Sequence, residues 1–327
     1  MSGERALVVG GSGFVGANLA HRLLSIGTPV RILDNLSRPG VERNLEWLRA
    51  THGDLLEVVI GDVRDPATVV RAVDGAGSVF HLAAQVAVTT SLVDPVTDFE
   101  VNARGTLNLL EAVRAQENPP FVLFTSTNKV YGALDDVRLV DLGNRYAPVD
   151  PALAGGISER RGLAFHSPYG CSKGAAEQYV LDWSHTYGIP TVVFRMSCIY
   201  GPRQFGTEDQ GWVAHFLIQA MNRRPITLYG DGKQVRDVLF VDDLPDAFLL
   251  ARERPREVSG RAFNIGGGPT NTVSLVELLE LVAELEACAP HVTFEDWRIA
   301  DQRWYVSDPG AFARLAGWAP RTGVREG

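Results

Sequence analysis

Residues 5–16 read RALVVGGSGFVG: an apolar run, four glycines that include the spaced set Gly10, Gly13 and Gly16, and the start of a helical pattern. Glycine allows a tight turn after a strand, and it lets a pyrophosphate approach the free N–H groups at the beginning of a helix. A plain structural turn is the alternative. The strand–turn–helix context favours a dinucleotide-binding fingerprint.

The same alternation of strand and helix continues outward from this stretch. Apolar runs end at turn-forming residues in VRIL, LEVVI, SVFHLA, FVLFTS and TVVFR, and helical patterns such as GANLAHRLLSIG and GTLNLLEAVRAQ lie between them. Strands that are apolar throughout and alternate with helices predict a parallel sheet covered on both faces. We therefore predict a doubly wound, Rossmann-type α/β fold, with its ligand beyond the carboxyl ends of the strands.

The pattern changes after residue 195, which predicts a cofactor-binding domain over 1–195 and a smaller, mainly substrate-binding portion over 196–327, interleaved with the first. In the second part we predict a helix over 212–222, short strands near Ile226 and Val238, and an amphipathic helix, SLVELLELVAELEA, that begins at Ser274. Residues 138–166 are rich in Gly, Pro and Arg and show no period, which predicts a long loop near the site.

The composition excludes several classes of function. An apolar content of 45% and a charged content of 21% are typical of a globular protein with a large core. A net charge of −8 argues against nucleic acid or an anionic membrane surface as a partner. No apolar run approaches the roughly 20 residues of a membrane span, and the chain opens without a cationic signal-peptide start. We expect a cytoplasmic protein.

The three cysteines, Cys171, Cys198 and Cys288, are too few and too scattered for a disulfide framework. No clustered Cys/His spacing indicates a metal, so we predict no metal site. Free cysteine is among the most buried residue types. We therefore expect three buried free thiols.

Asp34 ends the second predicted strand, where its carboxylate can accept hydrogen bonds from an adenosine ribose. A carboxylate there repels a 2′-phosphate, which favours NAD. Arg38 and Arg43 keep NADP open, since arginine can bind that phosphate. Asp62 follows the third strand and either contacts the adenine or serves as a turn aspartate.

The stretch SPYGCSKGAAEQY places Tyr169 and Lys173 one helical turn apart, so both side chains share a face. The chain has only three lysines, Lys129, Lys173 and Lys233, among 31 basic residues. A phenol with a pKa near 10 is a poor base at neutral pH, but an adjacent ammonium stabilises its phenolate. Tyr169 can then exchange a hydroxyl proton with a substrate while a nicotinamide exchanges hydride.

The stretch TSTNKVYG runs off the fifth predicted strand and holds three further candidates. Thr127 can hydrogen-bond the reacting oxygen alongside Tyr169, although a threonine there can equally satisfy a turn amide. Asn128 and Lys129 are expected to face the sugar.

Three more cations are candidates for a nucleotide diphosphate: Lys233, Arg236 and Arg303. For Lys233, a position in a solvated turn is favoured over binding of the diphosphate. For Arg236, the two roles are equally favoured.

With these motifs the chain resembles the extended short-chain dehydrogenase/reductase family (NAD-dependent epimerase/dehydratase), and within it the 2-epimerases of CDP-linked sugars. The resemblance covers almost the whole chain. Its most specific pieces are STNKVYG, HSPYGCSKGAAEQYVLDW and YGPRQFGTEDQGW, together with DNLSRPG, QVAVTTS, DFEVNARGTLNLLEAVR, GKQVRDVLF and AFNIGG.

The resemblance implies NAD as cofactor and catalytic roles for Thr127, Tyr169 and Lys173. The predicted cofactor contacts are Gly10, Gly13, Phe14, Val15, Gly16, Asp34, Asn35, Ser37, Asp62, Val63, Leu82, Ala83, Ala84, Gln85, Asn102, Thr125, Tyr169 and Lys173. The predicted substrate contacts are Thr127, Asn128, Lys129, Gln204, Gln210, Arg236 and Arg303.

The predicted function is epimerisation of a nucleotide-linked hexose at carbon 2 through a transient 2-keto sugar. A 4-epimerase is the alternative, since it needs only the Thr–Tyr–Lys set and NAD. The related 4,6-dehydratases need an Asp–Glu pair after the threonine, where this chain has Asn128 and Lys129. A non-catalytic NAD-sensing regulator is a third possibility, but such a protein has no need of an intact triad.

Three departures from the family pattern stand out: Val9 where threonine is usual, Met196 where histidine is expected, and an end at GVREG that suggests a missing terminal helix. The resemblance also implies a homodimer that pairs through helices near 98–115 and 170–184.

Overall fold

The computed structural model describes residues 4–286 and 289–327, and its contacts divide the chain into two compact units. Unit 1 comprises Met1–Ser126, Pro168–Arg195 and Leu244–Phe263; unit 2 comprises Thr127–Ser167, Met196–Asp243 and Asn264–Gly327. Residues 127–167 of the predicted cofactor part thus belong to unit 2, and residues 244–263 of the predicted substrate part belong to unit 1. Which unit binds which ligand stays a prediction.

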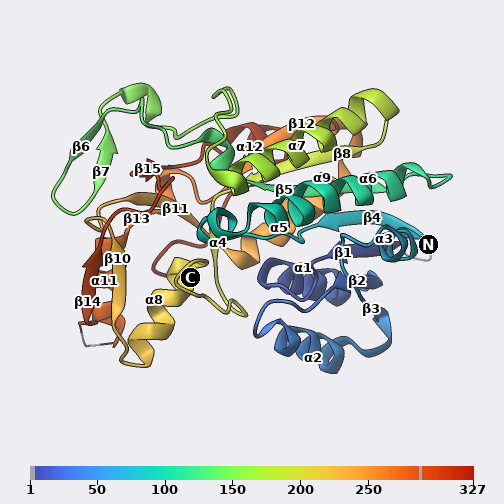
Figure 1. The fold of residues 1–327 in the computed structure, drawn as a ribbon, viewed down its shortest axis with the longest axis horizontal. Helices are drawn as coiled ribbons and strands as arrows, with labels where there is room; N and C mark the ends of the chain where they lie inside the picture. The colour runs from blue at the N-terminus through green and yellow to red at the C-terminus, as the bar shows by residue number, and fades with distance from the viewer. Residues whose placement is uncertain (1–3, 287–288) are drawn as a thin grey trace. The chain divides into compact units, whose positions relative to one another are not determined.

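Unit 1 is built on a seven-stranded sheet in the order β12-β8-β5-β4-β1-β2-β3 (Figure 1). The strands are β1 (Arg5–Val9), β2 (Val30–Asp34), β3 (Leu56–Ile60), β4 (Ala76–His81), β5 (Phe121–Thr127), β8 (Thr191–Met196) and β12 (Arg261–Ile265). The pairs β1–β2, β2–β3, β1–β4 and β4–β5 are parallel. Since β1 lies between β2 and β4, the strand order reverses at β1, and the predicted doubly wound fold is confirmed.

Helices cover both faces of this sheet. They are α1 (Phe14–Ser25), α2 (Val41–His52), α3 (Pro66–Val73), α4 (Val88–Val93), α5 (Pro95–Phe99), α6 (Gly105–Arg114), α7 (Ser167–Tyr187), α9 (Leu244–Glu253) and α10 (Pro255–Val258). A π-helical turn, η2 (Glu100–Arg104), joins α5 to α6. Helices α3, α6 and α7 supply one apolar layer, and Figure 1 shows α6 and α7 side by side.

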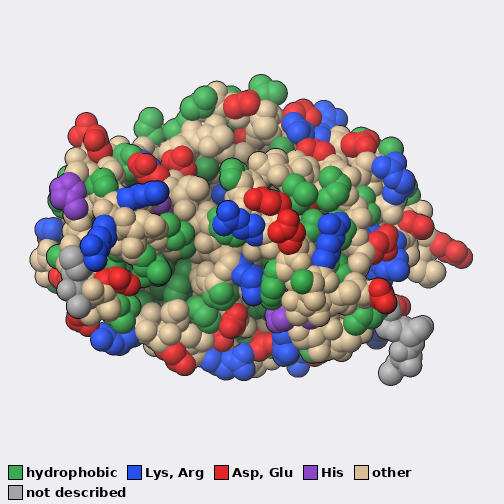
Figure 2. Space-filling view, turned by 90° about the horizontal axis from the view of Figure 1, so that it is seen from below, with side chains coloured by type: hydrophobic (Ala, Val, Ile, Leu, Met, Phe, Trp, Pro, Cys, Tyr) green, Lys and Arg blue, Asp and Glu red, His purple; other side chains and the backbone are tan. Residues whose placement is uncertain are grey.

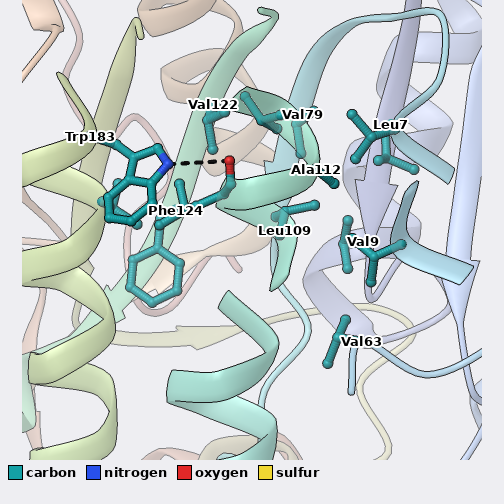
Figure 3. Close-up of a cluster of buried hydrophobic side chains, with 14 of the residues drawn as sticks. Leu7, Val9, Val63, Val79, Leu109, Ala112, Val122, Phe124 and Trp183 are labelled. Atoms are coloured by element: carbon teal, nitrogen blue, oxygen red, sulfur yellow. Dashed lines mark hydrogen bonds between the residues drawn. The ribbon is translucent and has the colours of Figure 1, made fainter. Parts of the chain in front are cut away.

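The core between the sheet and these three helices follows the alternation of the strands. In Figure 3 the side chains of Val79, Val122 and Phe124 point toward α6 and α7, and the Trp183 Nε1–H donates to the Leu110 carbonyl at 3.2 Å. Burying one such side chain stabilises the fold by roughly 1.5–3 kcal/mol. Because its N–H is hydrogen-bonded, the indole of Trp183 can be buried in this core without leaving a polar group unpaired.

The opposite face is covered by α1, α2 and α9. Phe80, the neighbour of Val79 on β4, points to this side and stacks on Phe248 of α9, with ring centroids 6.1 Å apart. Phe194 of β8 lies 5.7 Å from the same ring. Successive residues of one strand thus fill two different cores, which is why these strands are apolar throughout.

Unit 2 is a smaller mixed structure. Its strands include β9 (Cys198–Tyr200), β11 (Val235–Phe240), β13 (Thr272–Ser274) and β15 (Trp304–Tyr305) in one sheet, and the pair β10 (Ile226–Tyr229) and β14 (Val292–Glu295). Its helices include α8 (Trp212–Met221), α11 (Leu275–Glu286) and α12 (Gly310–Ala316). The predicted helix at 212–222 and the strands near Ile226 and Val238 are confirmed.

Helix α11 begins as predicted, with Ser274 as its cap. The Ser274 Oγ accepts from the Glu277 amide at 3.1 Å, and Glu277 Oε2 accepts from the Ser274 amide at 2.8 Å. This reciprocal pair is a capping box, which satisfies two amides that a helix start otherwise leaves free.

The prediction of a long loop over 138–166 is wrong in part. A hairpin of β6 (Leu139–Asp141) and β7 (Tyr146–Pro148) lies there, followed by a short 3-10 turn, η4 (Pro151–Leu153). The hairpin is held inside unit 2, because the Tyr146 amide donates to the Lys233 carbonyl at 3.0 Å and the Ser274 hydroxyl donates to the Asn144 carbonyl at 2.7 Å. Strands of three residues are too short to show a period in the sequence.

The thiol prediction also needs correction. Cys171 and Cys198 are free, but Cys171 is exposed on α7 and Cys198 is only half-buried; Cys288 lies outside the described residues. Cys171 lies on the exposed face of α7, whereas its neighbour Ser172 is buried.

On the face shown in Figure 2, basic and acidic side chains are interspersed, without an extended area of one sign among the described residues. In the part of the chain that the structure describes, no helix is both long and apolar enough to cross a bilayer. Within residues 4–286 and 289–327, no three His, Cys, Asp or Glu side chains gather in a way that would hold a metal ion.

Candidate functional site

The glycine loop between β1 and α1 is shaped by close backbone contacts. Gly10 has φ +82°, and a Cβ there would lie 2.7 Å from the Ala83 amide nitrogen. A Cβ on Gly16 would collide with the Gly10 carbonyl oxygen, whereas one on Gly13 would lie 3.3 Å from it. Gly10 and Gly16 are therefore required for the turn and for the packing of α1, which leaves the N-terminus of α1 open to a phosphate.

The Ser12 hydroxyl of this loop and the Asp34 carboxylate at the end of β2 both fit a bound dinucleotide. The Ser12 hydroxyl is fully buried and has no hydrogen-bond partner among the described residues. The Ser12 amide donates to Asp34 Oδ2 at 2.9 Å, and the Leu36 amide donates to Asp34 Oδ1 at 2.9 Å. Each carboxylate oxygen keeps a lone pair for a ribose hydroxyl. A phosphate oxygen would supply the partner that Ser12 lacks.

The residues after β2 and β3 form a connected polar edge. The Asn35 amide donates to Asp62 Oδ2 at 2.8 Å, and the Ser37 N–H donates to Asn35 Oδ1 at 3.0 Å. Arg64 forms an ion pair with Asp62 at 2.8 Å, and its hydrogen bonds hold the pKa of that carboxyl well below its usual value. Asp62 is therefore anionic over the physiological range.

The turn after β4 lies against the glycine loop. The Leu82 amide donates to the Val9 carbonyl at 2.8 Å, and Ala83 contacts Gly10. Asn102 clamps the next residues, because its Oδ1 accepts from the Gln85 amide at 2.9 Å and its Nδ2 donates to the Gln85 carbonyl at 3.0 Å.

The structure thus gathers most predicted cofactor contacts at one edge of the sheet. They follow β1 (Gly10, Gly13, Phe14, Val15, Gly16), β2 (Asp34, Asn35, Ser37), β3 (Asp62, Val63) and β4 (Leu82, Ala83, Ala84, Gln85), with Asn102 on η2 and Thr125 in β5. This edge is formed by the carboxyl ends of parallel strands beside the strand-order reversal, where ligands of such sheets bind.

Tyr169 and Lys173 lie in the first part of α7 and are 8% and 3% exposed. The Tyr169 amide donates to Ser91 Oγ at 3.2 Å, which ties the start of α7 to α4. The Lys173 Nζ lies 4.0 Å from the centroid of the Phe124 ring. Burial lowers the pKa of Lys173 to about 7, against the opposing effect of Glu177 and Asp98.

Sequence reasoning missed the polar groups packed around Lys173. Glu177 accepts from Ser126 Oγ at 2.7 Å and from Arg195 Nε at 3.0 Å. Asp98 accepts from Ser172 Oγ at 2.5 Å. A signal was present, because an arginine inside the apolar strand TVVFR must find a buried acidic partner, and Glu177 follows Lys173 by one helical turn.

Thr127 ends β5 and begins unit 2. Its Oγ1 accepts from the Lys129 amide at 3.2 Å and donates to Asn128 Oδ1 at 3.3 Å, so the hydroxyl caps the short 3-10 helix η3 (Asn128–Tyr131). The alternative role for this threonine, satisfying a turn amide, is therefore present. The contact to Asn128 is long enough for the hydroxyl to exchange it for a better acceptor.

Two of the predicted substrate cations converge on one carboxylate within unit 2. Arg236 Nη2 lies 2.7 Å from Asp301 Oδ1, and Lys129 Nζ lies 3.7 Å from the same oxygen. Lys129 also donates to the Ala300 carbonyl at 3.2 Å, and burial lowers its pKa. The Asn128 amide donates to Gln302 at 3.4 Å. A carboxylate already occupies the place where these cations could meet an anionic ligand.

The remaining candidates lie apart from this cluster. Arg303 is exposed, and its guanidinium lies 5.0 Å from the Trp297 ring and 5.9 Å from the Tyr146 ring. Lys233 pairs with Asp141 at 2.7 Å. Gln204 donates to the Ile199 carbonyl at 3.2 Å, while its Oε1 is buried without a partner among the described residues. Gln210 makes a backbone bridge with Thr207.

Comparisons with known proteins agree with this arrangement. The model of the NAD dependent epimerase/dehydratase family matches residues 6–266. CDP-paratose 2-epimerase of Salmonella typhi is 43% identical to this chain over 99% of it and 96% of the relative. UDP-glucose 4-epimerase of Mycolicibacterium smegmatis is 32% identical over 99% and 96%. The crystal structure of the Thermus thermophilus UDP-glucose 4-epimerase complex with NAD superposes with a TM-score of 0.81 at 33% identity, over 99% of this chain and 96% of the other.

Proposed function

We propose that this chain, which belongs to the NAD dependent epimerase/dehydratase family, is an epimerase that inverts carbon 2 of a CDP-linked hexose through a transient 2-keto sugar. The observation that carries the proposal is the 43% identity to a CDP-paratose 2-epimerase over nearly the whole of both chains. The residues after Thr127 support it, because Asn128 and Lys129 offer no carboxyl group for the loss of water that a dehydratase performs.

NAD fits the edge of the sheet formed by the glycine loop, Asp34 and the turn after β4. When bound, it supplies the hydride acceptor and donor of the reaction. The Asp34 carboxylate would hold the ribose hydroxyls, and the free amides at the start of α1, with Ser12, would hold the pyrophosphate. Since Asp34 repels a 2′-phosphate, NAD is preferred to NADP.

The proton is moved by Tyr169. Its phenolate takes the proton of the sugar 2-hydroxyl as the carbon is oxidised and returns it when the ketone is reduced from the other face. Lys173, whose ammonium is buried one turn further along α7, stabilises the phenolate. Thr127 donates its hydroxyl to the same sugar oxygen after giving up its weak contact to Asn128.

The diphosphate of the substrate would be recognised by cations of unit 2. Arg236 and Lys129 are the candidates, since both already bind an anionic group, Asp301. A diphosphate carries more charge than one carboxylate and can displace it. Gln204, with a buried oxygen that lacks a partner among the described residues, offers an acceptor to the nucleotide or the sugar.

Isotope labelling tests the reaction. A CDP-linked hexose deuterated at carbon 2 is incubated with the protein and NAD in ordinary water, and the product is analysed by NMR. Retention of deuterium at carbon 2 of the inverted product is expected. Loss of the label to solvent would indicate enolisation, and inversion at carbon 4 would establish the alternative 4-epimerase. GDP- and UDP-linked sugars in the same assay test the choice of base.

We also propose that the protein is a cytoplasmic homodimer. Helices α4 to α6 and α7 leave large apolar side chains exposed, with Val93 at 87% and Val96 at 70%, and Phe99 and Tyr179 also exposed. A second copy of the chain that covered these side chains would bury an exposed apolar area of a kind that is unusual on the surface of a monomer. Light scattering at micromolar concentration should give a mass near twice 35.6 kDa, and a monomer would contradict the pairing.

A further inference from the structure

Lys173 is a buried cation that lacks a direct acidic partner among the described residues. Its ammonium lies over the Phe124 ring, and within residues 4–286 and 289–327 it forms no ion pair. A buried charge without compensation is costly, and an aromatic ring offsets only part of that cost. The remaining compensation must come from carboxylates slightly further away, and two are present, Glu177 and Asp98.

Glu177 is already matched by another cation. Its carboxylate pairs with Arg195, with Nη2 2.5 Å from Oε1, and it also accepts from Ser126. Arg195 and Glu177 are 5% and 0% exposed, so this pair is neutral as a unit and is closed to solvent. Although Glu177 is shared with Arg195, its carboxylate still opposes the decrease in the Lys173 pKa, ahead of Asp98.

Asp98 is the second carboxylate that acts on Lys173. It is fully buried, and in the described part of the chain its partners are neutral. The Ser172 hydroxyl donates to Oδ2 at 2.5 Å, and the Asn102 amide donates to Oδ1 at 3.1 Å. Both oxygens accept hydrogen bonds, an arrangement that suits an ionised carboxylate. Ser172 directly precedes Lys173 on α7, and Asp98 and Lys173 each shift the pKa of the other.

We propose that Asp98 is a positioning residue of the reaction: its carboxylate, held by Ser172 and Asn102, acts together with Glu177 as an electrostatic counterpart of Lys173 and helps to keep that ammonium charged next to Tyr169. The inference rests on the role proposed for Lys173. Asn102 extends the arrangement to the cofactor edge, because the same amide that binds Asp98 also holds the backbone of Gln85.

The directions of the pKa shifts agree with this arrangement. Burial lowers the pKa of Lys173, while Glu177 and Asp98 oppose the decrease. Burial raises the pKa of Asp98, while Ser172 and Lys173 oppose the increase. His81, on the β4 side, has a pKa lowered by burial and by Lys173. Among the described residues, the titratable and charged groups around the ammonium are therefore Asp98, His81, Tyr169 and the Glu177–Arg195 pair.

The small number of lysines allows a direct test. With lysine labelled at Cε and Nζ, NMR of the cofactor-free protein gives one signal for each of three side chains, and a Lys173→Met variant identifies one of them. In Asp98→Asn the Lys173 titration should move to lower pH by about one unit, because a nearby negative charge is removed. Glu100→Gln, a change to a partly exposed carboxylate on η2, is the matched control and should leave the titration in place.

A folded Asp98→Asn protein with an unchanged Lys173 titration would overturn the proposal. If that variant does not fold, the wild-type protein supplies the test. The carboxyl carbon of Asp98 should then shift at the pH at which Lys173 loses its proton, and a carboxyl signal that ignores this pH would also overturn it. Neither the Lys173 titration nor the Asp98 carboxyl shift needs a substrate. Both measurements therefore test the proposal even if the proposed epimerase activity is not found.

Where activity is present, the pH dependence of kcat/KM separates electrostatic positioning from simple structural support. Removing the Asp98 charge lowers the pKa of Lys173, so the part of the pH profile that reports the Lys173 ammonium should move toward acid in Asp98→Asn, along with the NMR titration. A uniform loss of rate with an unmoved profile would indicate a structural role only and count against the proposal.

Discussion

Arg195 of β8 and Glu177 of α7 form a buried ion pair, with Arg195 Nη2 2.5 Å from Glu177 Oε1 and Nε 3.0 Å from the same oxygen. The pair joins the helix that carries Tyr169 and Lys173 to the central sheet. Neither side chain has access to water that could replace its partner. The alignment of α7 therefore depends on this one contact more than on any exposed ion pair.

Removing one partner should be strongly destabilising. We expect Glu177→Gln to lower the free energy of unfolding by about 3–5 kcal/mol, because Arg195 is left charged and buried. Denaturant unfolding followed by circular dichroism measures the change. Glu111→Gln, which breaks the exposed pair of Glu111 with Arg114, is the control and should have little effect. Similar losses in the two variants would contradict a special role for the buried pair.

His81 should make the protein sensitive to acid. Burial lowers its pKa to about 3, whereas an unfolded histidine titrates near 6.5. Between these values the unfolded chain binds one more proton than the native protein, so stability falls as pH falls from 6.5 toward 3, by up to about 1.4 kcal/mol per pH unit.

The slope of unfolding free energy against pH is the quantity to measure. His81→Gln should reduce that slope over the acidic range, even if the variant is less stable at every pH. His166→Gln, at an exposed position, serves as the comparison and should keep the wild-type slope. An unchanged slope in His81→Gln would show that another group takes up the proton.

Gly16→Ala should weaken NAD binding by about 10²-fold, since a small displacement of positioning groups has effects of that size. The added methyl would meet the Gly10 carbonyl oxygen and force α1 away from the glycine loop. Calorimetric titration with NAD measures the loss. Gly162→Ala, where a methyl group meets open space, is the matched control and should bind NAD like the wild type.

Tyr169→Phe should retain NAD binding and lose turnover by about 10²–10⁴-fold, the contribution of a positioned proton donor or acceptor. The ring remains in place while its hydroxyl is removed. Steady-state kinetics measure the loss, and Tyr179→Phe, at an exposed tyrosine on the same helix, is the control variant. Activity of Tyr169→Phe near that of the control would assign the proton to a different residue.

Much of unit 1 was predictable because its signals are local. The stretch RALVVGGSGFVG specifies a strand, a tight turn and a helix within a few residues, and each later apolar run became a strand of the parallel sheet. The spacing of Tyr169 and Lys173 likewise specifies one helix face without tertiary information. The loop predicted over 138–166 failed for the same reason, since β6 and β7 are too short for any local pattern.

The sequence by itself determined the chemistry that is available: the glycine turn, the acidic end of β2, and a tyrosine and a lysine one turn apart. Only the tertiary structure decided which charges lie near Lys173, because Asp98, Glu177 and Arg195 come from different elements and meet through packing. Their effect depends on burial, and burial is a property of the folded chain that residue spacing does not encode.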